Sequence, residues 1–363
     1  MRKVLLIGPY PPPFGGLAVQ LCQWQRYLAS SNEYQCEVLN IGEGRTTPLE
    51  GCRPVTSEWH FVQQVTRYSR QGYLLHLLTN GHNRKSWLSC LVCAAAGLLN
   101  GRRTIFVLGS GDTARFLSQA DVADRLIARV AIKLAGHVIC RNESARRVLM
   151  EMGAQDSRIS IMPGFLGVGD ASDQTVPSHV RQFMNDHAPV LGATASSDPE
   201  YGIPLMIDAL ASLRDRHPKA GLVLMGPHRG QVEQQYGPLP DHILVTGGLP
   251  HDAVMATMQH LHIFLRPTSF DGDSISVREA LSMGIPVVAS NVGFRPEGVV
   301  LFPSGELSGF VESILRLLSY PLRRFDGRPH QQSETGDRLL ALYDQLFVSG
   351  SKNDRTDVAM GRI

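Results

Sequence analysis

Long hydrophobic runs are missing from this chain, and their absence excludes a protein that spans a membrane with helices. No run reaches the roughly 20 apolar residues that a helix needs to cross a bilayer. Residues 1–7 have the pattern of a short strand entering a Gly-Pro loop, so no secretory signal peptide is predicted. We therefore expect a protein that is soluble or lies on a membrane surface.

Cysteine and net charge are also scarce. The six cysteines are scattered, and only Cys90 and Cys93 lie close together, in an apolar helix-like run with no second pair at zinc spacing. This pattern favours buried core thiols over a redox or metal site, and it fits a reducing compartment. With 35 Lys and Arg against 33 Asp and Glu, the net charge is +2, so no nucleic-acid partner is expected.

The most informative stretch runs from residue 266 to residue 298, where a strand end, a polar loop, a short helix and a second strand are predicted. Ser276 stands three residues before Glu279, which is the pattern of a capping box at a helix N-terminus. The apolar, β-branched run at 285–289 predicts a buried parallel strand. A helix N-terminus at the carboxyl end of a strand favours phosphate and other anions.

Two acids lie eight positions apart in this stretch, Asp271 before the predicted helix and Glu279 within it. Between them, Ser274, Ile275 and Ser276 offer backbone amides and two hydroxyls. One carboxylate near a sugar and one near a ribose, with amides between them for a diphosphate, would hold a nucleotide sugar. The alternative is that Glu279 only closes the capping box and Asp271 only shapes the loop.

The stretch resembles the signature of the retaining glycosyltransferases of family 4, which have the GT-B fold. That family carries two glutamates eight positions apart, a small-residue helix, a glycine and a PVVAS-like strand. Glu279 and the run GIPVVASNVG fit this pattern, whereas Asp271 is one methylene shorter than the expected glutamate. The resemblance extends over nearly the whole chain and implies an α/β protein of the GT-B class, with two doubly wound Rossmann-like domains facing a central cleft.

The resemblance and the alternation of strands and helices together predict the division of the chain. A stretch rich in Gly, Ser, Asp and Pro indicates the linker. We expect residues 1–168 to form the acceptor-side domain, 169–188 the linker, 189–330 the nucleotide-sugar-binding domain, 331–348 a helix that packs back on the first domain, and 349–363 a disordered tail.

In the first domain, Gly15 and Gly16 follow the first predicted strand. They would let the backbone approach a ligand at a helix start, or they form a plain turn. The resemblance favours the ligand, because the first loop of GT-B glycosyltransferases has such a pair near the reacting sugar. A His-Gly pair of the family, after the fourth strand, is absent here. The cleft and acceptor contacts that the resemblance implies are Gly109, Ser110, Asp112, Asn142 and Glu143; Asn142 also suits a helix cap.

Two cations of the family are missing from the second domain. An arginine and a lysine there neutralise the donor diphosphate, but Ala193 and Tyr201 stand at those positions. We predict that Arg278 or Arg295 takes this role, with His228 as a further candidate if it is protonated. The alternative is that these arginines lie on a solvated helix face.

The resemblance assigns a role to each part of the second-domain site. Asp271 contacts the transferred sugar, Glu279 holds the ribose, and both count as catalytic. Leu249 packs on the base. The predicted donor contacts are Gly15, Gly16, Leu249, Asp271, Gly272, Ser274, Ile275, Ser276, Arg278, Glu279 and Arg295. No metal and no cofactor are expected beyond the donor substrate.

A predicted helix at 117–135 carries Arg125, Arg129 and Lys133 at every fourth position, so they form one basic stripe. Such a face beside apolar residues could rest on anionic lipid, or it is simply solvated. The lipid-linked acceptors of the family keep the membrane alternative open.

The resemblance implies a retaining, metal-independent hexosyltransferase. It would move a sugar from a UDP- or GDP-sugar to a glycan or polyprenyl-linked acceptor, in bacterial exopolysaccharide, capsule or O-antigen synthesis. The expected location is the cytoplasm or the inner face of the plasma membrane. A second hypothesis is a catalytically inactive GT-B subunit that supports an active partner, and a third is an epimerase-like GT-B enzyme.

Overall fold

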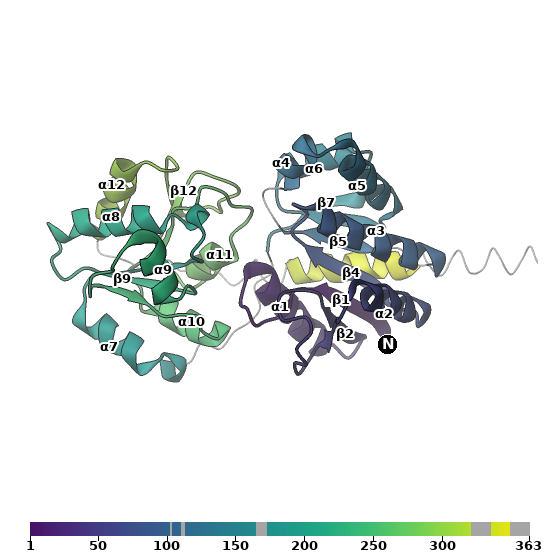
Figure 1. The fold of residues 1–363 in the computed structure, drawn as a ribbon, viewed down its shortest axis with the longest axis horizontal. Helices are drawn as coiled ribbons and strands as arrows, with labels where there is room; N and C mark the ends of the chain where they lie inside the picture. The colour runs from purple at the N-terminus through teal and green to yellow at the C-terminus, as the bar shows by residue number, and fades with distance from the viewer. Residues whose placement is uncertain (102–103, 110–112, 165–172, 321–334, 349–363) are drawn as a thin grey trace, which may run out of the picture. The chain divides into compact units, whose positions relative to one another are not determined.

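The computed structural model describes residues 1–101, 104–109, 113–164, 173–320 and 335–348 (Figure 1). The chain divides into two compact units. Unit 1 consists of Met1–Gly167 with His330–Ile363, and unit 2 consists of Val168–Pro329. Each unit has its own sheet, and every pair of neighbouring strands in both sheets is parallel.

Unit 1 is built on a seven-stranded sheet with the order β3-β2-β1-β4-β5-β6-β7. The chain therefore changes direction across the sheet between β1 and β4, which makes this pair its topological switch point. The strands are β1 (Arg2–Gly8), β2 (Tyr34–Asn40), β3 (Arg53–Pro54), β4 (Leu74–Thr79), β5 (Ile105–Leu108), β6 (His137–Cys140) and β7 (Ile159–Ile161). The helices are α1 (Gly16–Ala29), α2 (Glu58–Arg70), α3 (Arg84–Leu99), α4 (Thr113–Gln119), α5 (Val122–Leu134), α6 (Glu143–Glu151), the short η1 (Asp156–Arg158), and residues 335–348.

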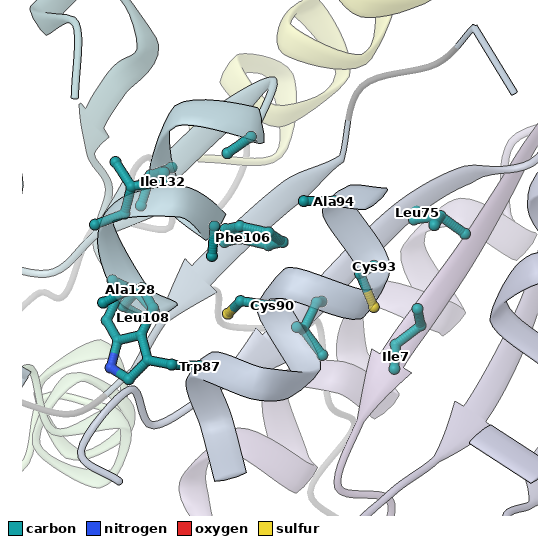
Figure 2. Packing of buried hydrophobic residues seen from close by; sticks show 14 of the residues in the cluster. Ile7, Leu75, Trp87, Cys90, Cys93, Ala94, Phe106, Leu108, Ala128 and Ile132 are labelled. Carbon is teal, nitrogen blue, oxygen red and sulfur yellow. The ribbon is translucent and has the colours of Figure 1, made fainter. Parts of the chain in front are cut away.

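The core of unit 1 has two layers, because successive side chains of β1 point to opposite faces of the sheet. Figure 2 shows part of one layer, where α3 and α5 pack on the sheet. Cys90 and Cys93 lie in this layer with no exposed surface, which confirms the prediction of core thiols. Burial raises the pKa of the Cys93 thiol and keeps it neutral.

The other layer of unit 1 contains the helix at 335–348 together with α1. Leu339, Leu342 and Tyr343 are buried there. The Tyr343 hydroxyl is hydrogen-bonded to Nδ1 of His76, a fully buried histidine on β4. This helix, far along the chain, is thus tied to a central strand of unit 1.

Unit 2 is built on a six-stranded sheet with the order β10-β9-β8-β11-β12-β13. Its topological switch point lies between β8 and β11. The strands are β8 (Val190–Thr194), β9 (Gly221–Met225), β10 (Ile243–Val245), β11 (Ile263–Arg266), β12 (Val287–Ser290) and β13 (Val299–Phe302). The helices are α7 (Ser178–Asp186), α8 (Ile203–Arg214), α9 (Arg229–Tyr236), α10 (His251–Gln259), α11 (Ile275–Ser282) and α12 (Leu307–Leu318), with the short η2 (Asp173–Thr175) and η3 (Pro199–Tyr201).

Two segments differ from the prediction. The single helix predicted at 117–135 is two helices, because the Asp121 side chain accepts a hydrogen bond from the Asp124 amide and caps a new helix, α5. Part of the predicted linker is helix α7, which belongs to unit 2 because Val180 and Phe183 are buried in its core. The predicted tail at 349–363 lies outside the described residues. None of the described helices is both long and apolar enough to cross a lipid bilayer.

Candidate functional site

The candidate site of unit 2 lies at its switch point, outside the carboxyl ends of β8 and β11. Thr194 ends β8 and Arg266 ends β11. Arg266 Nη1 donates to the Thr194 carbonyl at 3.2 Å, so the two strand ends are joined directly. In an open parallel sheet, ligands bind in the crevice at this point, since the loops diverge there.

Asp271 is the centre of a buried cluster that we call the arginine–aspartate cluster, with Arg266 and Arg295. Asp271 Oδ2 lies 2.9 Å from Arg266 Nε and 2.8 Å from Arg295 Nη1. Thr268 Oγ1 is also 3.3 Å from Asp271 Oδ2 and 3.1 Å from Arg295 Nη2. Burial of Asp271 opposes its ionisation, but the charge and hydrogen bonds of Arg266, and then of Arg295, outweigh burial and hold its pKa below the ordinary range.

The arginine–aspartate cluster carries an excess positive charge. Two guanidinium groups share one carboxylate, and the side chains of Arg266, Asp271 and Arg295 are only 13%, 9% and 4% exposed. A buried charge without a counterion costs free energy. A bound anion would supply the missing negative charge, so the cluster points to an anionic ligand.

Arg266 occupies the space next to the two positions that lack the expected cations. Its guanidinium carbon lies 5.0 Å from the centroid of the Tyr201 ring, and it contacts Thr194, the neighbour of Ala193. Gly202 fixes this arrangement, because its φ of +68° is left-handed and a Cβ there would lie 2.4 Å from the Pro267 carbonyl oxygen. Arg266 is not among the residues predicted from the sequence, since a strand-end arginine carries no recognisable motif.

The helix α11 begins earlier than predicted, and the predicted capping box is wrong. Ser274 is the N-cap residue and Ile275 the first helical residue, so Ser276 already lies inside the first turn. Ser276 Oγ contacts Ser274 Oγ at 3.1 Å. Glu279 instead pairs with His251 Nε2, at 2.6 Å from its Oε1.

The pair of Glu279 and His251 holds a carboxylate in a fixed position beside α11. Both side chains are mostly buried, at 9% and 19% exposure. His251 is the first residue of α10, and Leu249 lies just before it in the loop from β10. The amides of Ile275 and Ser276 stand in the first turn of α11, where a helix has no internal acceptor for them. This end of α11 therefore offers hydrogen-bond donors near a positive cluster.

The arginines predicted to serve a diphosphate are both held in ion pairs. Arg278 Nε lies 2.6 Å from Asp273 Oδ1, and its guanidinium carbon is 5.3 Å from the Phe294 ring centroid. Arg295 pairs with Asp271, as described above. The Arg278 side chain is 8% exposed, so Arg266, at 13%, is the most exposed of the three arginines. The role of Arg278 and Arg295 at a diphosphate stays a prediction.

The backbone of the Asp271 loop is fixed by a second glycine. Gly293 has a φ of +66°, and a Cβ on it would lie 2.2 Å from the Asp271 carbonyl oxygen. Phe294 donates its amide to the Gly272 carbonyl at 2.7 Å. The loop from 290 to 295 therefore supports the loop that carries Asp271.

In unit 1, Gly15 and Gly16 have no packing reason to be glycine. Gly15 is the N-cap residue of α1 with an extended backbone (φ −95°), and Gly16 is the first residue of the helix. A Cβ on either would meet nothing within 4 Å. Gly109 differs, because a Cβ there would lie 2.3 Å from Leu17 Cδ2, so close packing explains this glycine. The open space in front of Gly15 and Gly16 suits the approach of a ligand.

The other predicted residues of unit 1 have local contacts or lie outside the described residues. Asn142 caps α6 by accepting from the Ala145 amide at 2.8 Å, and Glu143 pairs with Arg146 at 2.8 Å. Ser110 and Asp112 lie outside the described residues. Across the described part of the chain, no group of three or more His, Cys, Asp or Glu side chains is arranged to hold a metal ion.

The fold of the chain is GT-B. It matches the crystal structure of Anabaena Alr3699/HepE in complex with UDP with a TM-score of 0.67 and 16% identity, over 97% of this chain and all of that chain. Sucrose-phosphate synthase from Thermosynechococcus elongatus gives a TM-score of 0.66 and 16% identity, over 99% of this chain and 100% of that one. The UDP-GlcNAc 2-epimerase of Neisseria meningitidis bound to UDP-GlcNAc also matches, with a TM-score of 0.59, 14% identity, and coverage of 94% and 100%.

The match to a family model falls within unit 2. Residues 188–320 match the family described as Glycosyl transferases group 1. The chain is 26% identical to the 2-deoxystreptamine glucosyltransferase of Streptomyces kanamyceticus over 212 residues, 54% of each protein. It is 27% identical to the MMP alpha-(1->4)-mannosyltransferase of Mycolicibacterium hassiacum over 187 residues, 50% of this chain and 43% of that protein. The chain thus spans about half the length of the curated relatives it matches.

Proposed function

We propose that the protein is a retaining glycosyltransferase that takes a hexose from a UDP- or GDP-sugar. The observation that carries the proposal is the arginine–aspartate cluster, which places an excess positive charge at the switch point of unit 2 beside the N-terminus of α11. A nucleoside diphosphate suits this place in charge and in hydrogen bonding. The match of residues 188–320 to a glycosyltransferase family and the UDP bound to the similar Anabaena protein support this choice.

In this proposal, different residues of unit 2 bind different parts of the donor. Arg266 and the first amides of α11 hold the diphosphate, and the Glu279 carboxylate, positioned by His251, accepts hydrogen bonds from the ribose. Leu249 packs on the base. Asp271 holds Arg266 in place and contacts the transferred sugar.

The reaction we propose needs charge stabilisation more than it needs a side-chain base. As the bond from the sugar to the diphosphate breaks, negative charge grows on the leaving phosphate oxygen. Fixed positive groups aimed at that oxygen lower the barrier, because they need no reorganisation during the reaction. Arg266 and α11 supply this charge, and the donor phosphate itself assists the incoming hydroxyl group on the same face.

The acceptor in this proposal is a glycan or a lipid-linked saccharide of bacterial exopolysaccharide, capsule or O-antigen synthesis, made at the cytoplasmic face of the membrane. The exposed face of α5 supports contact with anionic lipid, since it joins aliphatic and basic side chains. Its members are Val122, Leu126 and Val130, which are 85%, 60% and 37% exposed, together with the exposed Arg125, Arg129 and Lys133.

Calorimetric titration with UDP and with GDP tests the donor site. We expect one of the two to bind, and Glu279→Ala to weaken it at least tenfold, since a hydrogen bond to a carboxylate contributes about 1.5–3 kcal/mol. The exposed Glu312 on α12 gives a matched control, and Glu312→Ala should bind like the unaltered protein. Binding of neither nucleotide by a folded sample would refute the proposal and favour the inactive subunit.

The variant Gly16→Ala tests the prediction that a ligand approaches the start of α1. Alanine should stabilise the helix by about 0.5–1 kcal/mol, because a Cβ at this position meets no atom within 4 Å and alanine has the better helix propensity. Transfer should nevertheless slow at least tenfold, since the Cβ enters the open space that we assign to a ligand at the start of α1. The melting temperature and kcat are measured together, with Gly230→Ala, equally unobstructed in α9, as control. An unchanged kcat would show that no ligand approaches Gly16 during transfer.

A further inference from the structure

Unit 1 contains a cavity of about 480 Å³ at its own switch point, outside the carboxyl ends of β1 and β4. Pro9 follows β1, and Thr79 and Asn80 close the end of β4. Residues of α2 and α3, as far as Val62 and Val92, complete the wall. None of the described residues predicted as acceptor contacts lines this cavity, although Leu17, which does line it, follows Gly16 directly.

The wall of the cavity is largely apolar. Its side chains come from α1, from the segment after β2, from α2, from β4 and from α3, and include Leu17, Ile41, Phe61, Val62, Leu78 and Val92. An apolar cavity of a few hundred Å³ is the kind of site that buries a hydrophobic group. Such a wall gives a free saccharide few hydrogen-bond partners, so it selects a hydrocarbon portion.

The rim of the cavity carries a positive excess. Glu58 Oε1 lies 3.4 Å from Arg45 Nη2 and 3.6 Å from Lys85 Nζ, so two cations share one acid. All three line the cavity. The N-termini of α2 and α3 end beside them, capped by Ser57 and Asn83. Helix N-termini add partial positive charge, which favours an anion at this rim.

We propose that this cavity binds a lipid phosphate, with the hydrocarbon chain against the apolar wall and the phosphate at Arg45 and Lys85. The assignment of this ligand as the acceptor rests on the proposed transferase function. It selects the lipid-linked class over a free glycan, because only the lipid phosphate has both an apolar chain and an anionic group at one end. The cavity takes the part of the chain next to the phosphate, and the rest extends outside.

Farnesyl phosphate is the probe that tests the site on the full chain. Trp59 lies on α2, next to Glu58, and is 69% exposed, so its fluorescence can report binding at the rim. We expect saturable binding of farnesyl phosphate, at least tenfold weaker binding of farnesol, and no saturable signal from inorganic phosphate in the same range. Inorganic phosphate that binds as tightly as farnesyl phosphate would show a simple anion site and overturn the proposal.

Two variants that fill the cavity from different helices make the test specific. Val62→Phe on α2 and Val92→Phe on α3 should each weaken farnesyl phosphate at least tenfold while UDP or GDP binding in unit 2 stays the same. Leu98→Phe is the control on α3, because Leu98 is 49% exposed and does not line the cavity. Unchanged farnesyl phosphate affinity in both filled variants would overturn the proposal.

The experiments distinguish failure of the proposed transferase function from failure of the proposed lipid-phosphate site. Loss of nucleotide binding with intact farnesyl phosphate binding would leave a lipid-phosphate site in a protein that is not a transferase. Intact nucleotide binding without farnesyl phosphate binding would leave the donor site and exclude this cavity as the place of the lipid.

Discussion

The variant Arg266→Ala is expected to lower kcat for sugar transfer by at least 100-fold, the largest loss of any single substitution in unit 2. Removal of one preorganised group that stabilises transition-state charge typically costs about 10²–10³ in rate. Arg266 is placed for this role because it joins the ends of β8 and β11 and is the most exposed arginine of the buried cluster. The measurement is kcat and KM with the nucleotide sugar that binds in calorimetry.

Three comparisons separate this role from a merely structural one. Arg266→Lys keeps the charge and should recover part of kcat, although lysine cannot form the same fork with Asp271. Arg229→Ala removes an arginine that pairs with Glu233 on α9, and it should leave kcat unchanged. Normal kcat in Arg266→Ala, together with lost donor affinity in Arg278→Ala, would show that Arg278 and not Arg266 binds the diphosphate.

The overall fold could be predicted from the sequence because each element carries a local signal. Apolar strands such as β4, followed by Gly, Pro or Asn and a helix, indicate buried parallel strands in two doubly wound units. The sequence does not predict the break between α4 and α5, because the periodic pattern continues through Asp121, although the Asp121 side chain caps the next helix. Helix boundaries depend on such single contacts, which a periodic pattern does not contain.

Most of the predicted site residues of unit 2 are nearly consecutive in the sequence. The segment with Asp271 and Glu279 forms one loop and one helix, so its pattern survives in the sequence. Arg266 is recognised as a site residue only from its contacts with Thr194 and Tyr201, which lie 72 and 65 positions away in the sequence. His251 reaches Glu279 across 28 positions. These partners come together only through the order of the strands.

The partners also change the interpretation of the predicted residues. Asp271 alone suggested a sugar contact, but in the structure it binds two arginines and thereby leaves the cluster with one unbalanced positive charge. Glu279 suggested a capping box, but its partner is a histidine of another helix. The charge balance of a site is a property of the folded cluster, and it cannot be read from one motif.

Unit 1 is expected to lose about 4 kcal/mol of stability between pH 7 and pH 5. Burial, with the charge of Arg141, lowers the pKa of His76 to about 3, and burial lowers the pKa of His137 to about 4. Both histidines have a pKa near 6.5 in the unfolded chain. Between pH 7 and pH 5 the unfolded chain therefore binds protons that the folded unit does not bind. The stability that the two neutral histidines contribute is therefore present above pH 6.5 and is lost as the pH falls below it. Each proton bound only by the unfolded chain costs about 1.4 kcal/mol of unfolding free energy per pH unit, which gives about 2 kcal/mol for each histidine at pH 5.

Urea unfolding followed by tryptophan fluorescence measures this loss in unit 1 alone, because all three tryptophans, Trp24, Trp59 and Trp87, belong to it. The variant His76→Gln removes the buried titrating group and should reduce the pH-dependent loss by about half. His82→Gln, at an exposed histidine, should leave the loss unchanged. Equal stability of the unaltered protein at pH 7 and pH 5 would mean that the pocket around His76 admits a proton. The hydrogen bond to Tyr343 would then tolerate a charged imidazole.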